Sequence, residues 1–585
     1  MELTATEMRR VRPPRRGAFR FWIIFSLLLL VAASAGGTYY WFSVYYPSSE
    51  RAEPDLEGKK KPIYFEGAIW KEEALGTKEG LKLPLSLIRD KIDPTLLYEA
   101  ASDSVIITTK DKVIQLKTNM LTGMLNDKPI TLRFPVEKSS GSVFLPIESL
   151  RTYYGLDIRE SEESGIVMVY RVGQTIQWAT VSLPNAKPGK TVALRKSAGI
   201  KFPIVADLQP EEQVSILYEL DEWYLIQRKN GITGYVQKKH LAVGGTESIP
   251  TPKQDPPFVP WKPAGGKINM TWEHVTTKNP NTAQIGPMPG LNVISPTWFH
   301  LLDGEGNIKN YADAAYVKWA QSNNYQVWAL FDNNFDPAIT TEALSTHERR
   351  LKMIKQLLSF AQMYKLQGIN IDFENVNLKD KANLTQFIRE MAPLLHEQGL
   401  VLSMDVTVKS SSENWSMFYD RQALNESLDY MMVMAYDEHY AASPVAGSVS
   451  SLTWVEKSIV QIMKEDKVPP SKLVLGIPFY TRIWTEQMKD GKPTVSSRAV
   501  FMETAWNAAK DKKLTPVFLP EIGQNYVEYK EGEALNKIWL EDEVSVKARI
   551  ELVKKYDLAG VASWRRGYEA PAIWDLIQTT LESKP

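Results

Sequence analysis

The chain has 585 residues, of which 44% are hydrophobic and 24% charged, and its 69 basic residues balance its 69 acidic residues. This length exceeds one hydrophobic core, the composition excludes disorder throughout, and the zero net charge gives no global sign of nucleic-acid binding. The chain has no cysteine, and its six histidines form no metal-binding pattern. We therefore expect several domains, no metal, no cofactor and no nucleic-acid partner.

The N-terminus carries a membrane-crossing signal. Residues 1–20 are rich in arginine, and the uncharged residues 21–43 are mostly apolar. A helix of about 22 residues reaches about 33 Å, enough for a hydrocarbon core of about 30 Å. We expect a cytoplasmic basic tail, a single transmembrane helix over 21–43, and the remainder outside the membrane. A cleaved signal peptide ending at Ala33-Ser34-Ala35 is the alternative, which leaves a secreted protein.

The next segments predict a stalk and a small α+β domain. Residues 44–62 are polar and charged, which is typical of a stalk. Residues 63–173 alternate in short β-like runs separated by turn residues. The run Val143-Phe144-Leu145-Pro146, followed by a short helix ending at Gly155, resembles the N-terminal domain family of copper amine oxidases. Because this segment contains neither His nor Cys, we expect it to bind no copper.

Residues 188–243 predict a second small domain. The spacing of Leu194-Arg195, Trp223 and Gly234-Tyr235-Val236 resembles bacterial Src-homology-3-like (SH3-like) barrels, which implies binding to cell-wall peptide or glycan. The alternative is that Trp223 and Tyr235 fill the core of a plain barrel. Residues 244–267 carry six prolines and predict an extended linker.

From residue 268 to residue 585, short apolar runs alternate with helical periods. Eight runs, beginning with INMTWEHV and ending with AGVASW, predict the strands of a (β/α)₈ barrel. The long segment 489–537 between the seventh and eighth strands predicts an inserted α+β subdomain. The predicted architecture is therefore multi-domain, with a C-terminal TIM barrel.

The fourth predicted strand carries the most unusual residues. A period of two places Asn370, Asp372 and Glu374 on one face, pointing into the barrel at its carboxyl-terminal end, where such barrels carry their chemistry. A carboxyl group whose pKa is raised by an apolar wall and a second carboxylate can protonate a glycosidic oxygen near neutral pH. We assign Glu374 as the general acid and Asp372 as its neighbour. A buried structural polar network is the alternative.

This strand resembles the signature D-x-x-D-x-D-x-E of glycoside hydrolase family 18, in its spore-cortex and cell-wall branch. Gln367 and Asn370 occupy positions where the signature has aspartate. The resemblance implies substrate-assisted retention, in which the N-acetyl carbonyl of the sugar attacks its own anomeric carbon. Asp372 then orients the amide, and Glu374 acts first as acid and then as base.

Two further motifs support this resemblance. Met434-Ala435-Tyr436-Asp437 matches the family's M-x-Y-D element, which places Tyr436 on the N-acetyl carbonyl, and Trp564 matches the aromatic floor under the sugar. The predicted catalytic residues are thus Glu374, Asp372 and Tyr436. The predicted substrate-binding residues are Asn370, Asp437, Met434, Trp564, Trp298, Trp328, Tyr480 and Trp539. For the last four of these, plain packing is the alternative. Asp405, near the end of the fifth strand, is a buried charge without an assigned role.

The combined prediction is a membrane-anchored, outward-facing glycoside hydrolase that cleaves β-1,4 bonds next to N-acetylglucosamine in peptidoglycan. Hydrolysis of chitin or chito-oligosaccharides is an alternative that uses the same residues. A non-catalytic glycan-binding protein on an inactive barrel is a third hypothesis, which the replacements Gln367 and Asn370 keep open.

Overall fold

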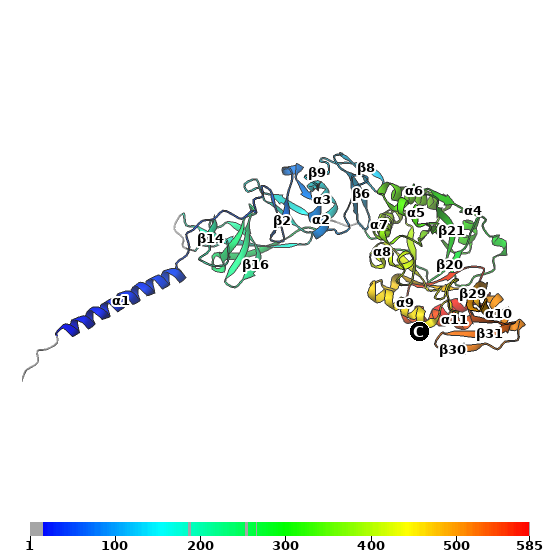
Figure 1. Cartoon of the computed structure of the whole chain (residues 1–585). Coiled ribbons are helices and arrows are strands. Elements are labelled where there is room, and N and C mark those ends of the chain that lie inside the picture. Colours follow the sequence, from blue (N-terminus) through cyan, green and yellow to red (C-terminus); the bar gives the residue numbers. More distant parts are fainter. Residues whose placement is uncertain (1–15, 185–188, 252–255, 265, 584–585) are drawn as a thin grey trace, which may run out of the picture. The chain divides into compact units, whose positions relative to one another are not determined.

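A computed structural model describes residues 16–184, 189–251, 256–264 and 266–583 (Figure 1). The chain divides into two compact units. The first comprises the chain up to residue 90 together with 137–254, and the second comprises 91–136 together with 255–585. Of the predicted basic tail, residues 1–15 lie outside the described part.

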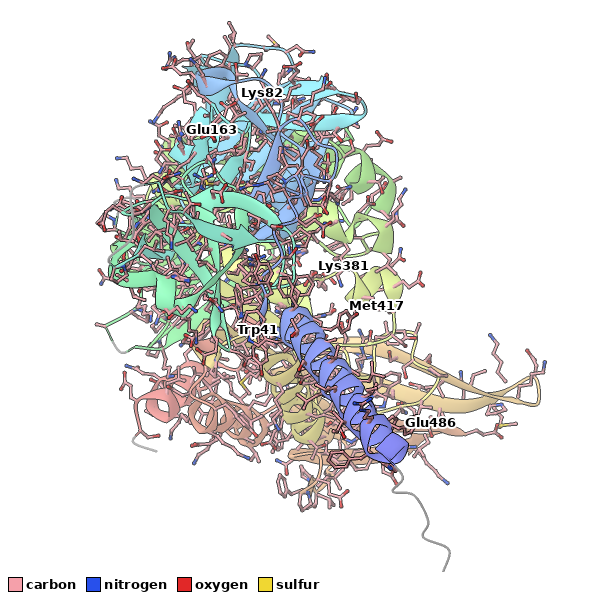
Figure 2. The ribbon with its side chains drawn as sticks, turned by 90° about the vertical axis from the view of Figure 1, so that its left-hand side faces the viewer. Trp41, Lys82, Glu163, Lys381, Met417 and Glu486 are labelled. Atoms are coloured by element: carbon pink, nitrogen blue, oxygen red, sulfur yellow. The ribbon has the colours of Figure 1, made fainter. Side chains whose placement is uncertain are left out.

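The first unit begins with helix α1 (Arg16–Tyr45), which extends the predicted segment 21–43 at both ends. Its span Phe19–Tyr45 is long and apolar enough to cross a membrane, and none of it is buried within the protein. Trp41, labelled in Figure 2, is 54% exposed on this helix. The helix therefore suits a signal anchor or a signal peptide equally.

Two small sheets and two short helices follow α1. A four-stranded sheet has the order β11-β12-β1-β2, and a three-stranded sheet has the order β3-β10-β9. The elements are β1 (Pro62–Phe65), β2 (Ala68–Glu73), β3 (Lys82–Pro84), α2 (Leu85–Lys91), β9 (Glu137–Ser139), β10 (Ser142–Pro146), α3 (Ile147–Tyr154), β11 (Asp157–Glu160) and β12 (Val167–Tyr170). Helix α3 ends at Gly155, whose φ of 65° is left-handed, so the predicted end of this helix is confirmed.

The SH3-like domain forms a seven-stranded sheet with the order β15-β14-β18-β17-β16-β13-β19. Its strands are β13 (Thr175–Val181), β14 (Val192–Arg195), β15 (Ile204–Leu208), β16 (Gln213–Leu220), β17 (Trp223–Arg228), β18 (Thr233–Gln237) and β19 (Leu241–Ser248). Residues 244–248 thus belong to a strand and not to the predicted linker. Trp223 and Tyr235 are half-buried and lie outside the hydrophobic core of this sheet. Part of the predicted stalk pairs with this sheet: the amide of Ala52 donates to the carbonyl of Ile204 in β15 at 3.0 Å.

The second unit contains the predicted barrel. Eight strands pair in parallel, and β20 closes the ring by pairing with both β21 and β33. The strands are β20 (Ile268–Glu273), β21 (Val293–Leu301), β23 (Gln326–Asp332), β24 (Gly368–Asp372), β25 (Val401–Thr407), β26 (Tyr430–Met434), β27 (Leu473–Pro478) and β33 (Gly560–Trp564). Short β22 (Ile308–Asn310) pairs antiparallel with β21. All eight predicted strands are confirmed.

Helices surround the barrel and share one apolar core with the outer face of its strands. They are α4 (Ala314–Ser322), α5 (Pro337–Leu344), α6 (His347–Tyr364), α7 (Lys381–Glu397), α8 (Arg421–Ser427), α9 (Leu452–Glu465), α11 (Glu543–Lys555) and α12 (Ile573–Glu582). A separate apolar cluster, which includes Met270, Trp272 and Trp328, fills the barrel interior.

The predicted insertion is confirmed between β27 and β33. It consists of β28 (Tyr480–Lys489), β29 (Lys492–Phe501), α10 (Met502–Asp511), β30 (Val517–Leu519), β31 (Gln524–Glu531) and β32 (Ala534–Leu540). The antiparallel sheet has the order β29-β28-β32-β31-β30 and its own apolar core.

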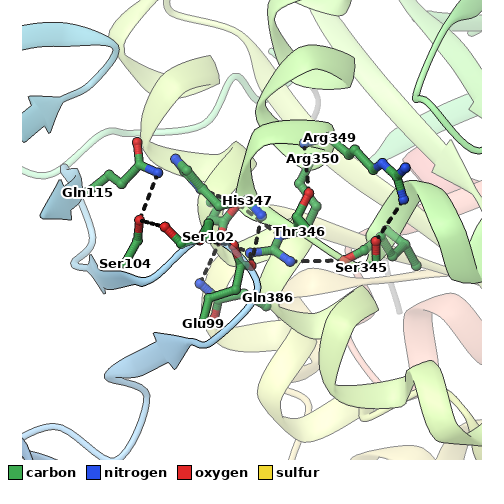
Figure 3. Close-up of polar contacts among 12 residues, drawn as sticks. Glu99, Ser102, Ser104, Gln115, Ser345, Thr346, His347, Arg349, Arg350 and Gln386 are labelled. Atoms are coloured by element: carbon green, nitrogen blue, oxygen red, sulfur yellow. Dashed lines mark hydrogen bonds and ion pairs between the residues drawn. The ribbon is translucent and has the colours of Figure 1, made fainter. Parts of the chain in front are cut away.

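The sheet of residues 91–136 is packed on the barrel helices. Its five strands are β4 (Leu97–Glu99), β5 (Ser104–Thr108), β6 (Val113–Lys117), β7 (Thr122–Leu125) and β8 (Lys128–Thr131). Ile106 and Val113 join the apolar core of the barrel. Glu99 accepts a hydrogen bond from Arg350 of α6 at 3.1 Å (Figure 3), and Arg350 also donates to Glu390 of α7 at 2.7 Å. This sheet therefore belongs to the same unit as the barrel.

The described residues 256–264 of the predicted linker also contact the barrel. The Tyr430 hydroxyl donates to the carbonyl of Trp261 at 2.8 Å, and the Phe258 ring stacks on His396 at 4.1 Å. Phe258 and Trp261 thus contact the barrel, so the expectation of an extended spacer is wrong for these two residues.

Arg350 is the central cation of the contact between α6, α7 and β4. Burial alone would raise the pKa of Glu390, but Arg350 and His347 lower it to about 2. We expect Arg350→Ala to reduce the free energy of unfolding by about 3–5 kcal/mol, because it leaves Glu390 buried without its arginine partner, with His347 and Gln386 as its remaining hydrogen-bond partners. Lys128→Ala, which breaks the exposed pair with Glu397, should cost less than about 1 kcal/mol. Urea unfolding followed by tryptophan fluorescence measures both, and equal losses would contradict this account.

Candidate active site

The carboxyl-terminal end of β24 separates polar from apolar side chains as predicted. Ile369, Ile371 and Phe373 face outward into the core shared with the helices, where Phe373 stacks on Phe387 of α7 at 5.8 Å. Asn370 is fully buried and Asp372 is 7% exposed on the opposite, inward face. The alternation of the strand thus places the two polar residues inside the barrel.

Glu374 follows β24 and is held by its backbone. Its amide donates to Asn333 Oδ1 at 3.0 Å, and its carbonyl accepts from Asn333 Nδ2 at 2.7 Å. The same amide nitrogen of Asn333 donates to the Thr340 hydroxyl at 2.9 Å. Asn333 comes directly after β23, so the end of one strand fixes the residue that follows the next.

The surroundings of Asp372 and Glu374 favour the protonated form of both carboxyl groups. Burial, and then the charges of Asp437 and Asp332, raise the pKa of Glu374 to about 7. Burial, and then the charge of Glu374, raises the pKa of Asp372 well above its ordinary value. A carboxyl with a pKa near 7 can act as both acid and base at neutral pH.

Asn370 is part of a hydrogen-bonded chain across three strands. Its Nδ2 donates to Asp405 Oδ2 on β25 at 2.7 Å, and its Oδ1 accepts from the Ser403 hydroxyl at 2.7 Å. The Trp272 ring of β20 also donates to Asp405 Oδ2, at 3.1 Å. Asn370 therefore contacts Asp405, and both polar atoms of its side chain are hydrogen-bonded to protein groups.

The residues after β26 and β27 meet beside these acids. Tyr436 is half-buried, and its ring lies 6.4 Å from that of Tyr480. The Tyr480 hydroxyl donates to Asp437 Oδ1 at 2.7 Å, and Arg482 lies 3.7 Å from the same oxygen. Burial raises the pKa of Tyr436 most, and the charge of Asp405 is the next cause. Met434 is 8% exposed at the end of β26.

Trp564, the last residue of β33, is half-buried at the same end of the barrel. Its ring lies 5.9 Å from Trp272 and 6.1 Å from His274. The structure thus brings Trp564 and Tyr436 to the partly exposed edge of the interior cluster that contains Trp272.

Two of the predicted aromatic subsite residues are buried away from the site. Trp298 is fully buried between strands and helices and donates to Asn279 at 2.7 Å. Trp328 is fully buried in the barrel interior, stacked on Tyr430 at 5.6 Å near the amino-terminal start of β23. Neither ring is accessible to a sugar, so these two predictions are wrong. Trp539 is half-buried on the insertion and packs at 4.9 Å on Tyr526.

Two features at this end of the barrel were not predicted. His300 Nδ1 lies 2.7 Å from Asp332 Oδ2, and Asp332 is one of the charges that act on Glu374. Trp415 is 46% exposed, next to Asn414, whose carbonyl accepts from the amide of Val376. The sequence shows that a tryptophan is present at position 415, but only the fold shows that it is exposed and lies beside the loop of Glu374.

The strand order and the acids at the carboxyl-terminal end define a (β/α)₈ enzyme with a carboxyl pair on its fourth strand. A model of the family described as glycosyl hydrolases family 18 matches residues 268–569. Models of the bacterial SH3 domain and of the copper amine oxidase N-terminal domain match residues 190–242 and 73–169. The chain belongs to glycosyl hydrolases family 18, and its class of activity is that of a glycosidase.

Similar proteins have been named in Bacillus. The uncharacterized glycosylase YvbX of Bacillus subtilis (strain 168) is 29% identical over 304 residues, which cover 49% of this chain and 84% of that protein. The cortical fragment-lytic enzyme of the same organism is 25% identical over 265 residues, 44% of this chain and 60% of that protein. The crystal structure of the Bacillus megaterium QM B1551 spore cortex-lytic enzyme SleL aligns with a TM-score of 0.48 and 18% identity, covering 65% of this chain and 79% of that chain.

The position of Glu374 depends on Asn333, which gives a test of the geometry. We expect Asn333→Ala to lower kcat by about 100-fold, because loss of both backbone contacts releases the loop that carries Glu374. KM should change much less. Steady-state turnover of a soluble glycan substrate measures the effect, with Asn323→Ala at the exposed end of α4 as control. An unchanged kcat would mean that β24 alone holds the acid.

Proposed function

We propose that this chain is a membrane-anchored glycosidase that cleaves β-1,4 bonds next to N-acetylglucosamine in peptidoglycan, outside the cytoplasmic membrane. The observation that carries the proposal is the pair Asp372 and Glu374 at the carboxyl-terminal end of β24, with Glu374 at a pKa of about 7. The names of the similar Bacillus proteins, which include a cortical fragment-lytic enzyme, support a cell-wall glycan as substrate.

In this proposal the substrate supplies its own nucleophile. The N-acetyl carbonyl attacks the anomeric carbon while Glu374 donates its proton to the leaving oxygen. Asp372 accepts a hydrogen bond from the amide N–H and stabilises the positive charge of the cyclic intermediate. Glu374, now a carboxylate, takes a proton from the water that opens the intermediate, and the configuration at the anomeric carbon is retained.

Other side chains at this end of the barrel would bind the sugar. In this proposal the Tyr436 hydroxyl donates to the N-acetyl oxygen, and the face of Trp564 packs on the apolar side of a pyranose ring. Asp437, held by Tyr480, is available to a sugar hydroxyl. Trp415 offers a second exposed aromatic surface beside the Glu374 loop for a neighbouring sugar of the strand.

The N-terminal half would determine where the enzyme acts. Helix α1 fits a membrane anchor, and an anchored enzyme meets the wall at a higher effective concentration than a free one. The SH3-like domain is the candidate for contact with wall peptide or glycan. Neither part adds a group to the chemistry.

The decisive test of the proposed function is release of reducing ends. We expect the full chain in detergent to release them from purified peptidoglycan and Glu374→Gln to abolish the release, because glutamine cannot supply the proton. Glu348→Gln on the outer helix α6, whose carboxylate is 60% exposed, should retain activity. Chitin oligomers, which carry the same N-acetyl group, serve as the second substrate. Activity on chitin oligomers but not on peptidoglycan would mean that chitin is the substrate. Activity that survives Glu374→Gln would mean that Glu374 is not the general acid.

The pKa of Glu374 predicts the alkaline limb of the pH profile. The acid must be protonated, so we expect kcat/KM to fall as the pH rises through about 7. Asp437→Asn removes the charge that, after burial, raises this pKa most, and the alkaline limb should therefore move to lower pH. Asp303→Asn, at a partly exposed carboxylate in the loop after β21, is the matched control and should leave the limb in place. A limb that stays or moves upward in Asp437→Asn would contradict the assignment.

A further inference from the structure

A second aspartate lies beside Asp372 on the neighbouring strand. β24 and β25 pair in parallel with Asn370 opposite Ser403 and Ile371 opposite Met404. The next step of the same register brings Asp405 level with Asp372. Alternation along both strands sends these side chains into the barrel. Two carboxyl groups that are 7% and 1% exposed therefore share one level of the interior.

The hydrogen bonds of Asp405 use only one of its two oxygens. Oδ2 accepts both from Asn370 and from Trp272. The hydroxyl of Ser403 donates to Asn370 Oδ1, which fixes the amide so that its NH₂ group faces Asp405. Oδ1 of Asp405 is buried without a hydrogen-bond partner, and so is Oδ1 of Asp372. A buried carboxylate oxygen without a donor is destabilising, and protonation of one of the two acids supplies that donor.

The groups around the pair favour retention of a proton. The titratable groups that face it are Glu374, which follows β24, Asp332 of β23, Tyr419, which precedes α8, and Tyr436, which follows β26. Burial is the largest cause that raises the pKa of both aspartates. The hydrogen bonds from Asn370 and Trp272 oppose this rise at Asp405, and the charge of Glu374 adds to it.

We propose that Asp405 is a positioning residue that shares one proton with Asp372 across the β24–β25 strand pair. It supplies from β25 the carboxyl group that β24 lacks at Asn370, from a position outside the family's strand-four signature. The proton moves from Asp372 Oδ1 to Asp405 Oδ1 when Asp372 turns to the substrate amide, and it returns afterwards. The pair therefore gains and loses no proton over the cycle. The inference rests on the proposed function only in that Asp372 meets the substrate.

The first test needs no substrate. The full chain in detergent, labelled with ¹³C-aspartate, is examined by infrared difference spectroscopy between each variant and the parent. We expect the parent to hold a protonated aspartate at neutral pH, and this signal to disappear in both Asp405→Asn and Asp372→Asn. The control Asp303→Asn should keep it. A parent without the signal, or an Asp405→Asn variant that retains it, overturns the proposal.

The second test moves the carboxyl group back to β24. We expect Asp405→Asn to lower kcat at neutral pH by at least about tenfold while KM changes little. The double variant Asn370→Asp, Asp405→Asn exchanges an amide and a carboxyl across the same hydrogen bond, and it should restore most of the lost kcat. A purely structural role for Asp405 predicts that the double variant stays impaired.

The two tests separate this inference from the proposed function. If the infrared signal behaves as expected but the parent releases no reducing ends from any glycan, the proton-sharing pair stands and the proposed function fails. If the parent is active and the exchange of residues does not restore kcat, the positioning role is wrong while the glycosidase remains.

Discussion

An acid buried in this barrel must pair with a cation, accept hydrogen bonds or hold a proton, because an isolated buried carboxylate is too costly. The chain uses these solutions at different places. Within the part of the chain that the structure describes, four buried acids pair with arginine: Glu390 and Glu99 with Arg350, Glu541 with Arg549, and Glu273 with Arg566. Among the described residues, no ion pair reaches Asp372, Glu374 or Asp405. The paired acids hold helices and strands together, whereas the unpaired ones can gain and lose protons, which is what proton-transfer chemistry requires.

The sequence was sufficient for the barrel and for the acids of its fourth strand, because both follow from local periodicity. Eight apolar runs at regular spacing leave few architectures, and alternation along a strand separates Asn370 and Asp372 from Ile369 and Ile371 without knowledge of any partner. The raised pKa of Glu374 was also expected, but the charges that add to burial there are those of Asp437 and Asp332, and not that of the acid two residues away.

The aromatic residues and the contacts between strands could not be predicted in this way. A tryptophan on a barrel strand can face the interior or the helices, and it can lie at either end, so the spacing of Trp298 and Trp328 did not separate a subsite from the core. Asn333 and Asp405 act on residues of β24 from neighbouring strands, more than 30 positions away along the chain. The same limit applies to Glu99, whose buried contact with Arg350 joins the sheet of residues 91–136 to the barrel across about 250 positions.

The interior packing of the barrel explains why its acids are dry. Trp328 and Tyr430 fill the interior nearer the amino-terminal end than Asp372 and Asp405, and the Trp272 ring contacts Asp405 itself. Gly368 makes this packing possible, because a Cβ at its position would lie only 2.7 Å from the Trp328 ring. The floor of aromatic rings thus creates the desolvation that raises the pKa of both aspartates. It follows that a residue at the base of β24, four positions before Asp372 and remote from any substrate, contributes to the protonation of the site.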